Sequence, residues 1–385
     1  MTFGFKKDKP DREGLGIDSM ENKRLWHGEG STENSGISFV KMEGAGNDYV
    51  YVECFDKAVR NPQAFARRVS DRHRGIGSDG LILLKASPRA DCFMDIYNAD
   101  GSRGKACGNG LRCVAKLMYE KLGKVKKNID VETLSGVRRC SVEMYSERKA
   151  WVKAQMGAAN ILDLRVPVAD VAALLPAGVR IAAARMVDVG NPHCVLWLEA
   201  DQRYESPEGS GGPNCGSGGV GNTESGGFEE SFLARLDIEP AGRYLENYPG
   251  FPETVNVEFC TGLGCDMFMC DDGRMRPAVM ARVWERGSGE TLACGSGACA
   301  VFAAREYFAE HQMITYMDNA GIAEDNGCGS FWRDSCCVFM PGGRLCVERQ
   351  DNADRCSEGY PGGAFRCAGQ LLLCGEAVTV FTGSI

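Results

Sequence analysis

The sequence has little of what nucleic-acid-binding, membrane-spanning or exported proteins require. Its 44 Lys and Arg residues are outnumbered by 52 Asp and Glu residues, whereas nucleic-acid-binding domains are usually basic. No apolar run approaches the roughly 18 residues of a membrane-spanning helix, and no apolar segment typical of a signal peptide follows the N-terminus. The first 36 residues contain seven acidic residues, which transit peptides avoid. We therefore expect a cytoplasmic protein with no nucleic-acid or membrane partner.

Histidine and closely paired cysteines are also scarce. The chain has four histidines and 19 cysteines, and no two cysteines stand in a Cys-x-x-Cys arrangement. This excludes the usual zinc-finger spacing and a thioredoxin-like redox motif. Cysteine makes up about 5% of the chain, below the roughly 8–10% that marks a disulfide scaffold. No motif indicates pyridoxal phosphate or a metal, so we expect no cofactor, and we expect most cysteines to be small buried hydrophobic residues.

The composition, with 44% hydrophobic residues, supports sizeable cores, and the length favours two domains. Residues 1–36 lack periodicity and are predicted to be a disordered tail. Short strand-like runs begin at residue 37, and apolar residues at positions 111, 114, 115 and 118 predict one face of a helix. Residues 205–227 are rich in Gly and Ser and are interpreted as a flexible insertion. Two further loop-like insertions are predicted at 319–333 and 351–364.

Two segments of the chain repeat the same pattern. Cys-Gly-x-Gly stands at 107–110 and again at 294–297, and upstream of each copy Gly-Asn precedes a strand-like run, at 46–47 and 190–191. The Asn and the Cys are 60 residues apart in the first copy and 103 in the second. The Gly/Ser-rich insertion and a loop expected near 262–273 bring the second spacing toward the first. We therefore predict two homologous α/β halves.

Each repeated cysteine is predicted to lie at the first turn of a helix, where unpaired backbone N–H groups and the helix dipole favour anions. We expect this position to lower the thiol pKa of Cys107 and Cys294 toward neutrality. If the halves face each other, the helix ends can hold a carboxylate while one thiolate removes the α-proton and the other thiol returns a proton to the opposite face. A single copy is more typical of a tight turn with a buried thiol; the duplication favours the functional interpretation.

Seven motifs, in order along the chain, resemble those of diaminopimelate epimerase, the cofactor-independent enzyme of lysine and peptidoglycan precursor synthesis. The resemblance covers residues 39–385 apart from the insertions. The motifs are KMEGAGND (41–48), RGIGSDG (74–80), YNADGS (97–102), ACGNGLRC (106–113), GNPHC (190–194), NVEF (256–259) and WERGSGETLACGSG (284–297). Several such motifs in register are far more specific than any one of them.

The resemblance implies an α/β (α+β) fold of two pseudo-symmetric domains, each a β-sheet wrapped around a central helix, with the active site between them. The N-terminal half would comprise residues 37–158 together with a returning C-terminal strand at 372–385. The C-terminal half would comprise residues 159–371 and carry the insertion at 205–227. Family members are commonly dimers, so the resemblance makes a homodimer a possible assembly.

The resemblance also implies a role for each site residue in the interconversion of LL- and meso-diaminopimelate. Cys107 and Cys294 correspond to the acid/base pair, and His193 is kept as a supporting residue. The reacting α-carboxylate would be held by Gly108, Asn109, Gly295 and Ser296. The remaining substrate contacts would come from Asn47, Asn98, Asn191, Asn256, Glu285 and Arg286. This set suits a substrate with two amino-acid ends, because it offers several amide dipoles with one cation and one anion.

Plainer interpretations and rival functions remain open at this stage. Asn47 and Asn191 are also ordinary turn residues, and Glu285 and Arg286 could form a local ion pair. The chain has Glu43 where many family members have His, and glycine at position 80 where some place Gln. The closest rival is another two-thiol racemase of the same fold, acting on proline, hydroxyproline or histidine; the second is a non-catalytic binding relative. The set expected at the distal end of the substrate, Asn98, Asn191, Asn256 and Arg286, favours a diamino-dicarboxylate substrate. The two retained thiols argue against a protein that only binds its ligand.

Overall fold

The computed structural model describes residues 36–105, 107–201, 231–270, 275–311, 313, 334–350 and 365–385. Residues 1–35 of the predicted tail, the Gly/Ser-rich insertion at 205–227 and the predicted insertions at 319–333 and 351–364 lie outside this part of the chain. None of the described helices is long and apolar enough to cross a membrane.

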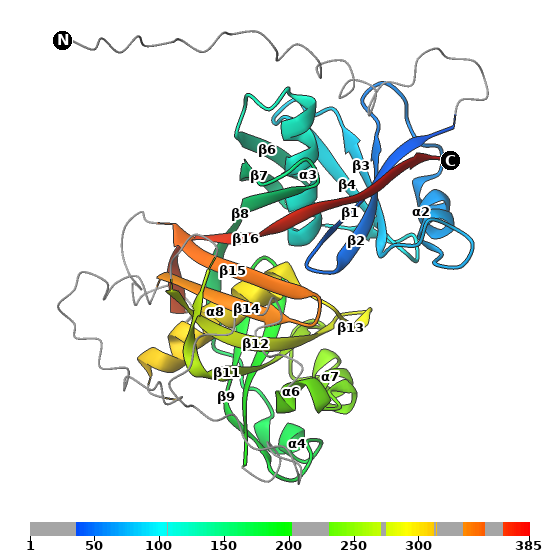
Figure 1. The fold of residues 1–385 in the computed structure, drawn as a ribbon. Coiled ribbons are helices and arrows are strands. Elements are labelled where there is room, and N and C mark those ends of the chain that lie inside the picture. The colour runs from blue at the N-terminus through cyan, green and yellow to red at the C-terminus, as the bar shows by residue number, and fades with distance from the viewer. Residues whose placement is uncertain are drawn as a thin grey trace, which may run out of the picture.

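The described strands of the first half form a closed ring around one helix (Figure 1). Hydrogen-bonded neighbours run in the order β8, β7, β6, β4, β3, β2, β1 and β16, and β16 pairs back with β8. The helix inside the ring is α3, Gly108–Lys121. The strands are β1 Ser38–Gly44, β2 Asn47–Glu53, β3 Gly80–Lys85, β4 Cys92–Asn98, β6 Asn128–Thr133, β7 Gly136–Met144, β8 Lys149–Leu162 and β16 Phe365–Ser384; the short β5, Arg103–Gly104, pairs with β4.

The second half repeats this arrangement around α8, Gly295–Glu310. Its ring of described strands runs β8, β9, β10, β11, β12, β14, β15 and β16, so β8 and β16 belong to both rings. The additional strands are β9 Val179–Asp188, β10 Pro192–Ala200, β11 Asn256–Met269, β12 Met275–Glu285, β14 Ser335–Met340 and β15 Gly343–Gln350; the short β13, Gly289–Thr291, pairs with β12. The loop expected near 262–273 is partly strand, because β11 continues to Met269 across a register shift after Gly262.

Strand directions match between the two rings. In the first ring β2 is parallel to β3 and β4 is parallel to β6. At the corresponding places in the second, β10 is parallel to β11 and β12 is parallel to β14. Each central helix follows a short strand, β5 or β13, and is followed along the chain by β6 or β14. The predicted fold of two pseudo-symmetric domains, each with a sheet around a central helix, is confirmed.

The central helices are buried because strands surround them. The residues that predicted the first helix, at positions 111, 114, 115 and 118, are all buried in the core inside the first ring. In α8 the run from Ala298 to Ala304 is apolar on every face and wholly buried in the second core. A helix that is apolar all round needs such complete enclosure.

The remaining helices cover the outer faces of the two rings (Figure 1). Helix α2, Pro62–Ser70, packs Phe65 and Val69 against the outer side chains of β2 and β3. Helices α4 Val168–Ala172, α6 Phe232–Arg235 and α7 Glu239–Glu246 lie against the second ring and help to form a separate core with its strands. In the last strand, residues 378–384 pair with β1 and residues 370–374 pair with β15.

Candidate active site

Cys107 and Cys294 occupy the same position in the two halves. Each is the N-cap residue of its central helix and has extended backbone angles. The Cys107 Sγ accepts a hydrogen bond from the Gly110 N–H at 3.3 Å, and the Cys294 Sγ accepts one from the Gly297 N–H at 3.3 Å. The sulfur thus takes the place of the hydroxyl oxygen that usually caps a helix.

The N-termini of the two central helices meet. A Cβ atom on Gly295 would lie 3.3 Å from the Gly108 Cα, and it would also contact the Leu373 side chain at 2.6 Å. Asn109 donates a hydrogen bond from Nδ2 to the Ala293 carbonyl oxygen at 3.3 Å, which joins the two helix ends directly. Glycine is therefore required at positions 108 and 295, because the two helix backbones approach closely there. The positive ends of the two helix dipoles converge on the same place.

A cavity of about 660 Å³ opens at this meeting point. It is lined by twelve of the thirteen residues predicted from the sequence, which come from both halves: Asn47, Asn98, Cys107, Gly108, Asn109, Asn191, Asn256, Glu285, Arg286, Cys294, Gly295 and Ser296. The thirteenth, His193, is fully buried behind the cavity wall.

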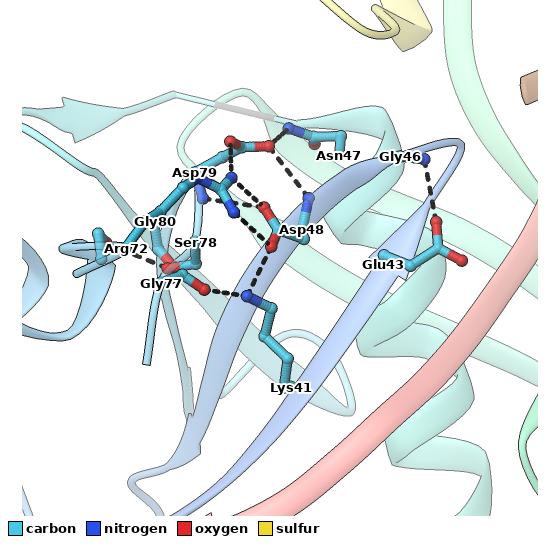
Figure 2. Close-up of polar contacts among 11 residues, drawn as sticks. Lys41, Glu43, Gly46, Asn47, Asp48, Arg72, Gly77, Ser78, Asp79 and Gly80 are labelled. Carbon is cyan, nitrogen blue, oxygen red and sulfur yellow. Dashed lines mark hydrogen bonds and ion pairs between the residues drawn. The ribbon is translucent and has the colours of Figure 1, made fainter. Parts of the chain in front are cut away.

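A network of charged side chains holds Asn47 in place (Figure 2). Its Oδ1 accepts a hydrogen bond from the Cys107 thiol at 3.5 Å, and its Nδ2 donates to Asp79 at 2.7 Å. Arg72 bridges Asp79 and Asp48, and Lys41 forms an ion pair with Asp48 at 2.5 Å. The network fixes the end of the turn between β1 and β2, so the direction of the amide is fixed with it.

The surroundings of Cys294 are acidic. Its Sγ lies 3.4 Å from the Ser296 hydroxyl oxygen, and the charge of Glu285 acts on its thiol. Glu285 accepts a hydrogen bond from the Thr291 hydroxyl. Behind these groups the fully buried His193 and Glu258 pair through Nδ1 and Oε1 at 2.6 Å. Two carboxyl groups therefore lie close to this thiol.

The other predicted contacts lie around the rim. The Asn256 Oδ1 accepts the Arg286 backbone N–H at 2.8 Å. The Arg286 guanidinium, with a side chain 37% exposed, pairs with Glu253 at 3.0 Å and not with its neighbour Glu285. Asn98 is exposed and bonds Ser102 at 2.9 Å. Polar groups from both halves therefore lie around the rim of the cavity.

The lowered thiol pKa values expected from the helix ends are not found. The pKa of Cys107 is raised by burial, which outweighs the opposing hydrogen bond from Gly110 N–H, and Glu285 raises it further. The pKa of Cys294 is raised well above its usual value, first by burial and then by the charges of Glu285 and Glu258. The expectation was wrong because an enclosed, partly acidic cleft penalises thiolates more than two hydrogen-bond donors favour them.

Sequence reasoning missed two residues beside the thiols. Tyr49 lines the cavity and interacts electrostatically with Cys107; its position, two residues after Asn47 on β2, puts both side chains on the same face of the strand. Glu258 stands in the same relation to Asn256 on β11. The signal for both was the two-residue period of a strand.

Within the described part of the chain, one group of three side chains is placed to ligate a metal, and it consists of Cys270, Cys337 and Cys346. None of the three lines the cavity.

The family model for diaminopimelate epimerase matches residues 39–162 and 228–359. The chain belongs to the diaminopimelate epimerase family. A diaminopimelate epimerase from Acetivibrio thermocellus is 37% identical over 277 residues, which cover 70% of this chain and 82% of that protein. One from Parabacteroides distasonis is 36% identical over 349 residues, which cover 91% of this chain and 98% of the relative. The resemblance found in the sequence is thereby confirmed.

Solved structures support the fold of this epimerase family member. A PhzF-family phenazine biosynthesis protein from Enterococcus faecalis superposes with a TM-score of 0.53 at 12% identity, covering 91% of this chain and 99% of that one. A PhzF-family protein from Bacillus anthracis gives a TM-score of 0.51 at 13% identity, with 91% and 98% covered. At such identities the likeness concerns the fold alone.

Proposed function

We propose that this protein is a diaminopimelate epimerase that interconverts the LL and meso isomers with two cysteines and without a cofactor. The proposal is carried by one observation: two equivalent N-cap cysteines stand at helix ends that meet at one cavity. Family membership supplies the substrate. The proposal keeps the cytoplasmic location predicted from the sequence, a reducing compartment in which both thiols stay free.

In the proposed reaction the α-carboxylate binds at the two helix ends, where backbone N–H groups of residues 108–109 and 295–296 point toward it. One cysteine, as the thiolate, takes the α-proton, and the C–H electron pair remains on the carbon as a carbanion. The helix ends stabilise the negative charge that spreads onto the carboxylate. The other thiol then gives its proton to the opposite face of the carbon and becomes the thiolate.

The raised pKa values fit this reaction. A thiolate whose conjugate acid has a high pKa is a stronger base, and the α-proton of an amino acid is only weakly acidic. In the free enzyme the thiols of Cys107 and Cys294 therefore stay protonated near neutral pH. The positive α-ammonium group of the bound substrate provides the charge that favours one thiolate, so the reactive base forms when the substrate is in place.

The distal end of the substrate carries a second ammonium and a second carboxylate. Arg286 would bind this carboxylate by leaving Glu253, an exchange that costs little at the exposed rim. The amides of Asn98, Asn191 and Asn256 would orient both groups. Glu285, which lines the cavity, would supply an anion that contacts the substrate.

The test is conversion of LL-diaminopimelate to the meso isomer by purified, reduced protein without added cofactor, followed by chiral chromatography. We expect conversion in both directions. L-Proline, trans-4-hydroxy-L-proline and L-histidine serve as competing substrates. Inversion of one of these with none of diaminopimelate would contradict the proposed substrate, and binding of diaminopimelate without conversion would contradict catalysis.

A further inference from the structure

Three cysteines from separate strands meet in the core beside the second ring. Cys270 stands directly after β11, Cys337 lies on β14 and Cys346 lies on β15. The Sγ atoms of Cys270 and Cys337 are 3.2 Å apart, those of Cys337 and Cys346 are 2.9 Å apart, and all three lie within 4.8 Å of one another. These separations exceed the roughly 2.05 Å of an S–S bond. We call these residues the thiol cluster.

The sheet register creates the cluster. Cys337 and Cys346 are direct partners in the β14–β15 ladder, so their side chains leave the same face of the sheet. Cys374 continues the row on β16 as the partner of Cys346, but it lies outside the mutually close group. Cys336, one residue earlier on β14, points to the opposite face and packs into the core around α8. The cluster is therefore a local convergence and not a general crowding of cysteines.

The cluster is closed to solvent. Its residues are 6%, 0% and 1% exposed for Cys270, Cys337 and Cys346. No histidine or carboxylate of the described residues joins the group at ligand distance. The three sulfur ligands found among the described residues fall short of the four that close a structural zinc site. Thiolates select soft ions, and monovalent copper is a soft ion that accepts three thiolates in a plane.

We propose that the thiol cluster is a three-coordinate site for a soft monovalent metal ion, Cu(I). Binding exchanges three thiol protons for one ion: Cu⁺ + 3 RSH gives [Cu(SR)₃]²⁻ + 3 H⁺, with no change of oxidation state. The site is independent of the proposed epimerase chemistry, because none of its residues lines the active-site cavity.

The surroundings suit the negative charge of such a complex. Arg276, which is 2% exposed, acts through its charge on Cys270, and the charge of Arg344 acts on Cys346. Among the described residues the nearby anion is Glu348, which is shared between Arg276 at 2.9 Å and Lys153 at 2.6 Å. Cations therefore outnumber anions in the described surroundings of the sulfur atoms, and a buried anionic complex needs such compensation.

The experiment is an anaerobic titration of the full-length, reduced protein with Cu(I), supplied as its acetonitrile complex in competition with bicinchoninate. We expect one copper per chain to resist the competitor and X-ray absorption to find three sulfur neighbours around it. Thermal unfolding with and without Cu(I) gives a second readout, because an ion that binds only the folded state raises Tm.

Single variants locate the site. Cys270→Ser, Cys337→Ser and Cys346→Ser should each lose the retained copper and the rise in Tm, while Cys336→Ser, altered on the same strand but the opposite face, should keep both. Cys270→Ser is the decisive variant if the others fail to fold, because Cys270 lies at a strand end. Equal copper retention in Cys270→Ser and Cys336→Ser would overturn the proposal. So would tight Zn(II) binding with no Cu(I) retention, or a Cys337–Cys346 disulfide in the freshly reduced protein.

Discussion

The two halves share a scaffold but differ in the charge around their thiols. Both present an N-cap cysteine whose sulfur accepts a backbone N–H at 3.3 Å. Cys107 bonds a neutral amide, Asn47, which a charged network holds in place. Cys294 lies beside the carboxyl groups of Glu285 and Glu258. The repeated arrangement therefore accounts for the shared geometry of the site, and the neighbouring side chains account for its electrostatic asymmetry.

This difference in charge bears on the roles of the two thiols. In the proposed reaction one thiolate removes the α-proton from one face of the carbon and the other thiol returns a proton to the opposite face, so the two thiols need similar positions. They do not need similar acidity, because the two substrates they act on are not mirror images at the distal end. The following predictions test where the halves are equivalent and where they are not.

The largest effect should come from the thiols themselves. Cys107→Ala and Cys294→Ala should each lower kcat for epimerisation by about 10³-fold or more, since each removes one partner of a two-base proton transfer. The measurement is initial rate in both directions.

Matched controls for the thiols exist further along the same helices. Cys113 in α3 and Cys299 in α8 are buried and lie outside the cavity. Cys113→Ala and Cys299→Ala should keep most of the activity. A strong loss in either control with no loss of stability would remove the distinction on which the account depends.

The next effect tests the meeting of the helix ends. A Cβ on Gly108 would contact Leu373 at 2.8 Å and approach the Gly295 Cα at 3.5 Å. Gly108→Ala and Gly295→Ala should therefore reduce kcat/KM by about 10- to 100-fold, because they displace the carboxylate-binding N–H groups. Steady-state kinetics checks this.

The control for the helix ends is Gly262→Ala, whose Cβ would meet only the Trp197 ring at an ordinary 3.5 Å. Its kinetics should match those of the wild type. Wild-type kinetics in both helix-end variants would mean that the backbone there does not hold the substrate.

Two carboxyl variants should separate the thiols. The charge of Glu285 raises the pKa of both Cys107 and Cys294. Glu258 is among the causes of the raised pKa of Cys294. Glu285→Gln should therefore lower both pKa values and Glu258→Gln that of Cys294. The measurement is the pH dependence of alkylation at each cysteine, followed by peptide mass mapping. An equal shift at both thiols in Glu258→Gln would contradict the asymmetry.

The smallest expected effect is on the free energy of unfolding in alkali, and it should be shared by the two halves. Burial raises the pKa of Cys92 and Cys113 in the first half, and of Cys299 and Cys336 in the second, to about 12 from 9.0. These thiols ionise more readily when the chain is unfolded. Their contribution to stability is therefore complete below pH 9 and is lost as pH rises toward 12.

Urea unfolding at pH 7, 8, 10 and 11 checks the alkaline effect. The free energy of unfolding should be constant between the first two and fall steadily above. A stability that is flat to pH 11 would show that the thiols ionise as easily in the folded chain as in the unfolded one.

Much of the fold could be predicted from the sequence because the same local patterns occur in both halves. Gly-Asn before a strand and Cys-Gly-x-Gly before a helix occur twice, and local patterns of this kind place a residue on its element. The repeat also favoured a shared site for Cys107 and Cys294, since equivalent positions in two facing halves meet. Contributions to a thiol pKa that depend on the complete surroundings of the side chain could not be predicted from such local patterns. Burial and the charge of Glu258, 36 residues before Cys294, reversed the expected direction of the thiol pKa.

The pairing of strands that are far apart in the sequence could not be predicted either. The thiol cluster joins Cys270 to Cys337, 67 residues away, so no short spacing announced it. The local ion pair that stayed open as an alternative for Glu285 and Arg286 is not formed, because Arg286 pairs with Glu253 from the segment before β11. Sequence neighbours on a strand face opposite sides, and the ion pair follows the fold instead.

The most direct test of the two-thiol account is the origin of the proton in the product. LL-diaminopimelate is incubated in deuterated buffer and stopped at a few per cent conversion, and both isomers are analysed by NMR and mass spectrometry. The account predicts one deuterium at the inverted carbon of the meso product, while unreacted LL substrate keeps its hydrogen, because one thiol takes the proton and the other delivers a solvent-derived one. Meso product that retains the substrate's own hydrogen would contradict it, since one base would then have worked on both faces.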